Sequence, residues 1–262
     1  MNRLRWNALF TLGALLSLLM LDLAGATPVD DVTALLRDAD RFRAEPDTAL
    51  QVETEVRVLK VDGSVDKERR YTVLLQPGHR SLVLMRSPAE AGQKVLMLGD
   101  DFWLLMPASQ RPMRITPMQK LLGDAATGDI ATLSWSEDYA GSRIGGEERC
   151  GEGPATRPCL HLSLKATRPG ITYPRIELWL GATRHEPLHA DLYVLSDKLA
   201  KQARFVFDRA DKPTQVEAME LVDQLSRGKV TQVRYLSRRP RQIPETWMNP
   251  MFLARNPALE TP

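Results

Sequence analysis

The sequence predicts a mainly β protein, in which ten to eleven antiparallel strands form one sheet that curls into a barrel or half-barrel. Three observations predict this class. Apolar and polar residues alternate along most of the chain after residue 49, turn-forming residues interrupt the alternation at short intervals, and a hydrophobic content of 43% supplies a core. An amphipathic helix and one short helical insertion interrupt the pattern, and both suit a cover over the open mouth of the sheet.

The first 26 residues predict a cleavable secretory signal peptide. Arg3 and Arg5 give a positive start, residues 8–21 are uncharged and mostly Leu, Ala and Met, and residues 24–26 (Ala-Gly-Ala) fit a cleavage site. The apolar run is shorter than the ~20 residues of a membrane span, which argues against an uncleaved anchor helix. We therefore expect a mature chain of residues 27–262 that forms one domain and works in a bacterial periplasm.

An amphipathic helix is expected next. Apolar residues follow a helical period from Val32 to Phe42, Asp30 or Asp31 precedes them as a cap, and Pro46 ends the helix. The period then changes to two, and turns rich in Gly, Asp and Pro divide the chain into short strands. These first strands are expected at residues 49–61, 67–76, 80–86, 93–98 and 102–106.

Residues 107–138 break the alternation. Prolines and glycines recur there, and two short helical pieces fit at 118–122 and 129–133. Long loops in compact domains tend to be functional. Strands resume afterwards, and residues 244–253 predict a final turn of helix. The second group of strands is expected at residues 142–149, 160–166, 175–180, 188–195, 201–208, 215–223 and 230–238.

Two cysteines, Cys150 and Cys159, flank the turn-forming residues 151–154. In an oxidising compartment two nearby cysteines usually pair, so we expect a disulfide. In the chain-entropy model such a short closed loop contributes ~2–3 kcal/mol. A reactive thiol is less well supported, because the sequence has no C-x-x-C motif.

The sequence offers no constellation for catalysis, a metal or a cofactor. It contains no H-E-x-x-H, G-x-S-x-G or P-loop motif. His185 and His189 would lie ~13 Å apart on a strand, too far to share a metal unaided. Neighbouring carboxylates such as Glu147 and Glu148 point to opposite faces of a strand and form no dyad. A formal net charge of +2 without a concentrated basic face argues against nucleic acid. Binding or carrying, rather than an enzyme activity, is the expected function.

One set of segments is more specific. The first is a strand ending in W-L-x-x-P at residues 101–107 (DFWLLMP), which a basic segment follows at 111–115 (RPMRI). A helical turn at 123–124 (GD) and an acidic-aromatic segment at 133–139 (LSWSEDY) come next. The last is the C-terminal ending at 243–248 (IPETWM). Together they resemble the LolA-like family of periplasmic outer-membrane lipoprotein-sorting proteins. The closest similarity is to the less-characterised branch that also occurs beside exporters of the resistance-nodulation-division (RND) type. The resemblance covers residues 31–252.

The resemblance implies an eleven-stranded half-barrel with helices as a lid over an apolar cavity. It also implies a carrier of the acyl chains of a lipid or lipoprotein, with an inner-membrane RND-type exporter and an outer-membrane acceptor as partners. Each CH₂ that leaves water for such a cavity gains ~0.8 kcal/mol, so carriage needs no cofactor. The alternative is an envelope sensor or adaptor that binds a membrane partner without cargo. The family's carriers tie down the lid with an arginine on a barrel strand, for which Arg69, Arg80 and Arg86 are candidates.

Inward-facing apolar side chains are the candidates for the cavity wall, although the core of any barrel requires the same pattern. The cavity candidates are Leu74, Leu82, Leu84, Met97, Trp103, Leu105, Leu162, Leu178 and Phe205. Methionine suits surfaces that repack around flexible chains, so the insertion is expected to supply the lid, or else a helix docked permanently on the barrel. The lid candidates are Met113, Met118, Leu121 and Leu122. Alternation alone leaves open which face of the sheet is concave.

Overall fold

The structure is a computed structural model that describes residues 31–43, 48–109, 111–115, 134–151, 153, 156–225 and 229–255. The predicted signal peptide, the two expected helical pieces of the insertion and the lid candidates Met118, Leu121 and Leu122 lie outside the described residues. The signal peptide and the single-domain organisation therefore stay predictions. None of the described helices is long and apolar enough to cross a bilayer.

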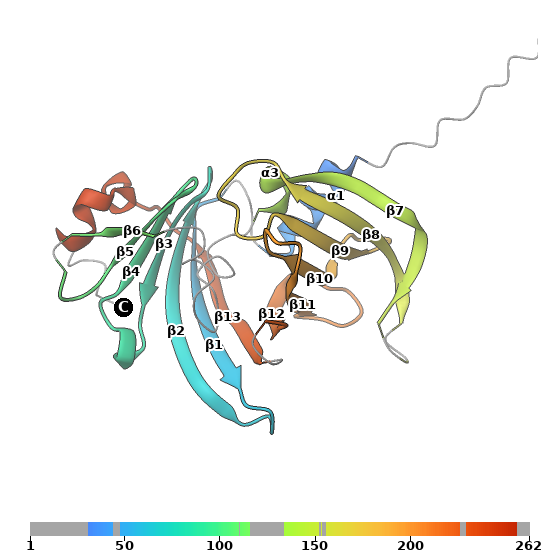
Figure 1. Cartoon of the computed structure of the whole chain (residues 1–262), viewed down its shortest axis with the longest axis horizontal. Coiled ribbons are helices and arrows are strands. Elements are labelled where there is room, and N and C mark those ends of the chain that lie inside the picture. The colour runs from blue at the N-terminus through green and yellow to red at the C-terminus, as the bar shows by residue number, and fades with distance from the viewer. Residues whose placement is uncertain are drawn as a thin grey trace, which may run out of the picture.

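A single antiparallel sheet of thirteen strands organises the chain (Figure 1). Its strands are β1 (Leu50–Leu59), β2 (Val65–Gln76), β3 (Arg80–Met85), β4 (Lys94–Leu98), β5 (Asp101–Leu105), β6 (Met113–Ile115), β7 (Tyr139–Cys150), β8 (Arg157–Ala166), β9 (Arg175–Gly181), β10 (Pro187–Tyr193), β11 (Leu199–Phe207), β12 (Val216–Asp223) and β13 (Val230–Pro240).

Strands that follow one another in sequence lie side by side, in the order β6-β5-β4-β3-β2-β1-β13-β12-β11-β10-β9-β8-β7. The first and last strands pair at the centre, while β6 and β7 form the two outer edges. The sheet is curved but does not close, which confirms the predicted mainly β half-barrel (Figure 1). The sheet has thirteen strands where ten to eleven were expected, and the short strand β6, which forms inside the segment expected to be an insertion, is one of the additional strands.

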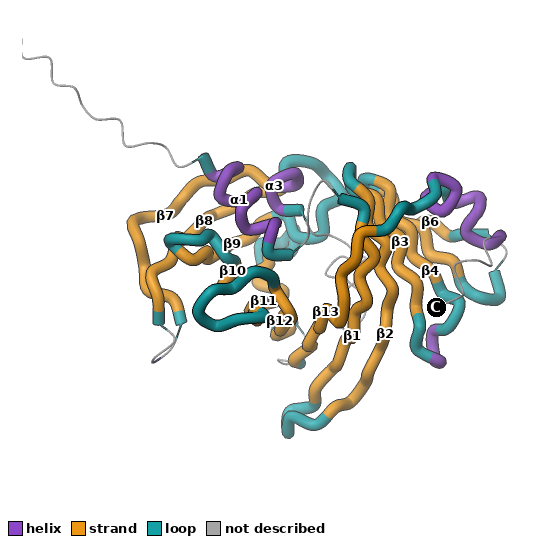
Figure 2. Tube along the Cα trace, turned by 180° about the vertical axis from the view of Figure 1, so that it is seen from behind, coloured by secondary structure: helices purple, strands orange, loops and turns teal. Residues whose placement is uncertain are grey.

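Two helices cover one face of the C-terminal half of the sheet (Figures 1 and 2). The first, α1 (Val32–Arg41), is capped by Asp31, whose Oδ1 accepts from the N–H of Thr33 at 3.0 Å. This is one of the two expected caps. Leu35, Leu36 and Ala39 are buried in the main core. The second, α3 (Trp135–Asp138), lies against α1 and leads directly into β7.

The register gives strands β2–β5 two buried faces. Val73, Val83 and Val95 form one cross-strand row that belongs to the main core, together with α1, α3 and the C-terminal half. The next residue of each strand points to the opposite face, where a second apolar cluster forms. That cluster contains Leu74, Leu82, Leu84, Leu96, Leu105, Ile243, Met248 and Leu253.

The second cluster is closed by residues 241–255, which we call the C-terminal strap. It contains the 3₁₀ helices η4 (Glu245–Met248) and η5 (Pro250–Arg255), where a final helical turn was predicted. Arg80 donates to both carboxylate oxygens of Glu245, at 3.0 and 2.6 Å. Gln76 Nε2 donates to the carbonyl of Ile243 at 3.1 Å. Apolar packing and these bonds hold the strap across the N-terminal half of the sheet.

The C-terminal half is different, because β8–β11 are buried on one face only. Leu162, Leu178 and Ala190 lie opposite one another on the inner face. On the outer face His161 and His189 flank Trp179, with ring centroids 4.3 and 5.1 Å from the indole. At the end of the β7–β8 hairpin the predicted disulfide between Cys150 and Cys159 is present, with Cα atoms 5.8 Å apart.

Candidate functional site

The nine predicted cavity residues divide between the two faces of the sheet. One group faces the C-terminal strap and comprises Leu74, Leu82, Leu84, Trp103 and Leu105. The other group faces the main core and comprises Met97, Leu162, Leu178 and Phe205. The structure therefore does not bring all nine to one cavity, and only Phe205 lines the pocket described next. The lid candidate Met113 lies on edge strand β6, and its side chain is 52% exposed.

An apolar pocket lies between the inner face of β9–β12 and helix α3. Ala190 and Ala203 are small residues in its floor, which leaves space that larger side chains would fill. Trp135 of α3 forms the roof, and its ring meets Phe205 edge-on at 5.7 Å. The pocket encloses about 50 Å³. Its lining among the described residues is Arg43, Ser134, Trp135, Tyr139, Ile171, Thr172, Tyr173, Ile176, Ala190, Leu192, Ala203, Phe205, Met219 and Leu221.

The roof is fixed to α1 through Asp40. This buried carboxylate accepts from the backbone N–H groups of Trp135 at 2.9 Å and Ser136 at 2.8 Å. The guanidinium of Arg43 lies 3.9 Å above the Trp135 ring, in a cation–π contact. Burial raises the pKa of Asp40, while the positive charge of Arg43 and the two N–H donors oppose that shift. The polar side chains that hold Trp135 in place, Asp40 and Arg43, therefore both come from the end of α1 and the residues directly after it.

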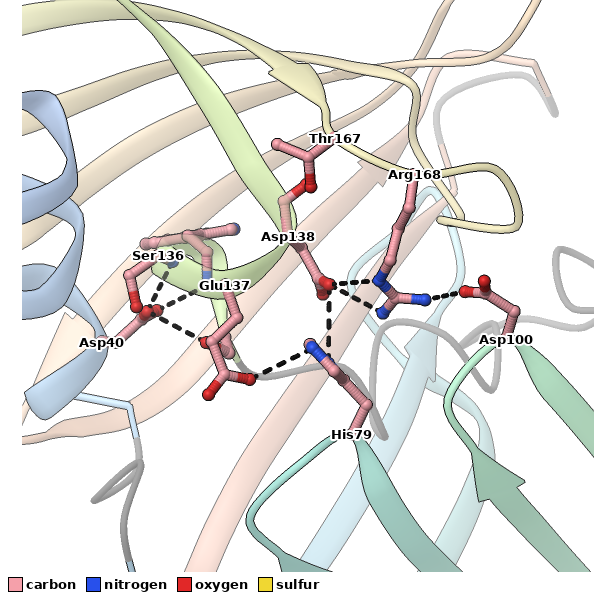
Figure 3. A network of polar contacts seen from close by, with 10 residues as sticks. Asp40, His79, Asp100, Ser136, Glu137, Asp138, Thr167 and Arg168 are labelled. Atoms are coloured by element: carbon pink, nitrogen blue, oxygen red, sulfur yellow. Dashed lines mark hydrogen bonds and ion pairs between the residues drawn. The ribbon is translucent and has the colours of Figure 1, made fainter.

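A polar network extends from α3 to two turns in the N-terminal half of the sheet (Figure 3). Its centre is Asp138, a fully buried carboxylate that accepts from Arg168 Nε at 3.2 Å and Nη2 at 2.7 Å. Thr167 donates to the Asp138 carbonyl through its N–H and its hydroxyl, at 2.9 and 3.0 Å. The loop between β8 and β9 is thus tied to the end of α3 by both backbone and side chain.

The same network reaches two turns of the N-terminal half of the sheet. Arg168 forms an ion pair with Asp100 in the β4–β5 turn. His79, in the β2–β3 turn, lies 3.2 Å from Glu137 and 3.5 Å from Asp138 (Figure 3). Gly170 has a φ of +90°, and a Cβ there would come within 3.0 Å of Asp100, so a glycine permits this close approach. The network therefore joins the two halves of the sheet beside the pocket roof.

Burial sets the protonation of this network. It raises the pKa of Asp138 to about 7, and the neighbouring carboxylates Glu137 and Asp40 add to the shift. The two hydrogen bonds from Arg168 favour the charged form and work against this increase. Burial also lowers the pKa of His79, with a further contribution from the positive charge of Arg168, while Glu137 opposes it. At neutral pH the imidazole is therefore mostly neutral, and Asp138 is close to its titration midpoint.

Two arginines contact α3, Arg43 at the ring of Trp135 and Arg168 at the carboxylate of Asp138, and the sequence singled out neither. The three arginines considered for this role have other partners: Arg69 pairs with Glu90, Arg80 with Glu245 of the strap, and Arg86 donates to Thr72. The sequence signal for the network is the segment 133–139, which contains Glu137 and Asp138 and contributes to the family resemblance. Among the described residues, no group of three or more His, Cys, Asp or Glu side chains is placed to hold a metal ion.

Comparison with known proteins agrees with the observed fold. A family model described as an uncharacterized protein matches residues 78–255. The chain is similar to a LolA superfamily protein from Nitrosomonas europaea, with 28% identity over 82% of this chain and 96% of that one, at a TM-score of 0.72. No protein of curated function matches the chain.

Two further solved structures share the fold. An outer membrane lipoprotein-sorting protein domain from Vibrio parahaemolyticus aligns with a TM-score of 0.64 and 18% identity, over 85% of this chain and 98% of that one. A DUF1329 family protein from Desulfovibrio piger aligns with a TM-score of 0.67 and 21% identity, over 85% and 97%.

Proposed function

The chain belongs to the family of uncharacterized proteins whose model matches residues 78–255, and its fold is the LolA-like, lipoprotein-sorting fold; on this premise we propose that it is a periplasmic carrier of acyl chains. It binds the chains of a lipid or lipoprotein in the pocket beneath α3. It then moves these chains from an inner-membrane partner to an outer-membrane partner. The proposed inner-membrane partner is an RND-type exporter.

The observation that supports this proposal most directly is an apolar pocket whose roof is a helix of only four residues. The floor consists of rigid strands, whereas Trp135 sits on a helix of four residues held by Asp40 and Asp138. Acyl chains require apolar walls and no directional bonds, because transfer from water alone provides the free energy.

The pocket is too small for an acyl chain while the roof is in place. One water molecule needs ~10–15 Å³ on this measure, so about 50 Å³ holds only a few. Loading therefore requires α3 to move away from β11, and the bonds of Asp40 and Asp138 resist that movement. The carrier is closed when empty and opens as the cargo replaces Trp135 against Phe205.

The experiment that tests the proposal is native mass spectrometry of the chain purified from periplasm without detergent. We expect an added mass that matches a lipid or an acylated peptide. Ala203→Leu should fill the floor of the pocket and reduce the loaded fraction severalfold. Gln202→Leu is the matched control, because the neighbouring residue of β11 faces the outer surface and should leave loading unchanged.

A bare protein that also gains no lipid when mixed with periplasmic membranes would contradict the proposal. Equal loading of both variants, with near-ultraviolet circular dichroism showing that both are folded, would place the cargo elsewhere. A bare protein that co-purifies with a single inner-membrane protein would instead support the sensor or adaptor function.

A further inference from the structure

Several apolar side chains stand in solvent on three hairpin turns. Val61 and Val65 flank the β1–β2 turn, Leu195 lies in the β10–β11 turn, and Leu225 in the β12–β13 turn. Val61 is completely exposed and Leu195 is 88% exposed, so almost no protein atom covers either side chain. Turns are normally polar, and exposed apolar residues grouped on one part of a surface usually indicate an interaction site.

The register places these three turns next to one another. Leu59 at the end of β1 lies opposite Val230, and Val230 lies opposite Val222 at the end of β12. The N–H of Gln224 donates to the carbonyl of Ala200 at 2.8 Å, which brings the β10–β11 hairpin level with them. The turns are therefore consecutive along one rim of the sheet, and Figure 1 shows the β1–β2 hairpin projecting from it. We call Val61, Val65, Leu195 and Leu225 the rim tips.

One aspartate in each of two of these turns is bonded within the turn itself, while Asp197 of the β10–β11 turn pairs with Arg175 of β9. Asp62 Oδ1 accepts from the N–H and hydroxyl of Ser64, at 2.9 and 2.6 Å. Asp223 Oδ1 accepts from the N–H of Leu225 at 2.7 Å. A turn that satisfies its own donors and acceptors can enter a less polar medium without leaving these groups unpaired. Val61 and Leu225 therefore lie beside aspartates whose carboxylates are already bonded within their own turns.

The charges of the described residues around the rim tips are balanced, and the sequence adds one positive charge, Arg227, between β12 and β13. Four lysines and four aspartates lie in or beside the three turns among the described residues: Lys60, Asp62, Asp66, Lys67, Asp197, Lys198, Asp223 and Lys229. Long-range attraction to an anionic surface is therefore weak. Lysine stems can nevertheless follow an inserted apolar residue while the ammonium groups stay in water.

We propose that the rim tips dock this protein on the surface of a lipid bilayer, with Val61, Leu195 and Leu225 inserted at the boundary between headgroups and acyl chains. These three exposed side chains lie on separate turns, and the surface of a bilayer can accommodate each of them without a complementary shape. A stable protein partner would need a continuous complementary area of about 800 Å² on each side. The inference goes beyond the proposed function, because a carrier that meets only membrane proteins needs no direct contact with lipid.

The test is sedimentation of the full chain, purified from periplasm, with vesicles. One vesicle type contains phosphatidylethanolamine and phosphatidylglycerol, and the other contains phosphatidylcholine alone. We expect binding to both types with little dependence on salt, because apolar insertion dominates. The combined variant Val61→Asp, Leu195→Asp and Leu225→Asp should bind at least about tenfold more weakly, since inserted apolar area is lost and charge is added.

Met251→Asp is the matched control. Met251 is 75% exposed but lies on the C-terminal strap, so its replacement should leave vesicle binding unchanged. A second readout uses Val61→Trp, whose fluorescence should be quenched by brominated acyl chains. Failure of the unaltered protein to sediment, equal binding by the combined variant, or no quenching would each overturn the proposal. Loss of cross-linking to a protein in the combined variant, without vesicle binding by the unaltered chain, would assign the rim tips to a protein contact instead.

Discussion

Strands β2–β5 are buried on both faces, whereas β8–β11 bury one face and present a row of polar and aromatic side chains to solvent on the other. In the N-terminal half, Leu82 and Val83 are neighbours in sequence and both are buried, one under the strap and one in the main core. In the C-terminal half, Leu162 is buried while its neighbour His161 lies on the outer face beside Glu177 at 2.9 Å. The two halves belong to one sheet but have different covers.

This difference indicates which half can admit a ligand. The N-terminal half lies between the strap and the main core, and opening it would expose two apolar faces at once. The apolar face of the C-terminal half is covered in part by α3, which is four residues long. Displacing this short element would uncover the pocket and break the bonds to Asp40 and Arg168. A pocket that opens is therefore compatible with the C-terminal half, while the N-terminal half supplies rigidity.

The largest expected effect comes from removing the strap. A chain that stops after Pro240 would expose Leu74, Leu82 and Leu96, which are fully buried, together with their cluster. At ~1.5–3 kcal/mol for each large side chain the loss is about 6 kcal/mol or more, comparable with the whole stability of a typical domain. We expect loss of soluble protein, or strong binding of a hydrophobic dye. A chain that stops after Arg255 keeps the strap and should behave normally; equal behaviour of the two truncations would contradict the two-faced burial.

A pair of substitutions compares the halves directly. Leu96→Ala removes a side chain of the second cluster from a site without exposure and should cost about 2–5 kcal/mol of the free energy of unfolding. Trp179→Ala removes a larger side chain from the outer face, yet it should cost only about 1–2 kcal/mol, because partly exposed ring contacts are lost rather than core. Denaturation by urea measures both values. A larger loss for Trp179→Ala would mean that the outer face of the C-terminal half is covered in solution.

The smallest effect concerns the network that joins the halves. Because burial raises the pKa of Asp138 to about 7, the folded state binds more protons than the unfolded state between about pH 4 and pH 7. This carboxylate therefore favours folding at the acidic end of the window, and its contribution is lost as the pH rises through about 7. Asp138→Asn should remove this dependence, so its stability relative to the unaltered chain should rise by roughly 1–2 kcal/mol from pH 5 to pH 7.5.

Thermal unfolding of the two chains across that range provides the measurement. His79 contributes in the opposite direction, since its pKa is lowered, and taking the difference between the two chains reduces this contribution. A difference that stays constant with pH would show that Asp138 is ionised throughout and that Arg168 dominates its environment.

The strands and the cysteine pair could be predicted from the sequence because their signals are local. Alternation at residues 160–166 and 175–180 was confirmed as β8 and β9, and Asp31 caps α1 as one of two expected residues. Alternation does not identify the outer cover, however. Continuous apolar runs such as 82–85 are typical of strands buried on both faces, and here Leu82 and Leu84 face the strap while Val83 faces the main core.

The pocket and its network depend on contacts that no local pattern encodes. Ala190 and Ala203 are small residues on different strands, and they become a pocket floor only once β9–β12 are aligned. Arg168 lies in a turn that alone would suggest a solvated charge, and its partners Asp100 and Asp138 come from distant parts of the chain. Long-range pairing of this kind needs a structure or an alignment of relatives, whereas charge and spacing within one sequence do not reveal it.

The central pair of the sheet also constrains the order in which the chain folds. Leu50 of the first strand lies opposite Pro240 of the last, while every other neighbouring pair joins consecutive strands. A chain that emerges N-terminus first can form its hairpins one by one, but β1 keeps an unpaired edge until β13 arrives. Contacts between such distant residues form slowly, and a bare edge invites association with other chains. We therefore expect that closure of this seam, rather than formation of any hairpin, limits the folding rate and determines how long the nascent protein needs protection.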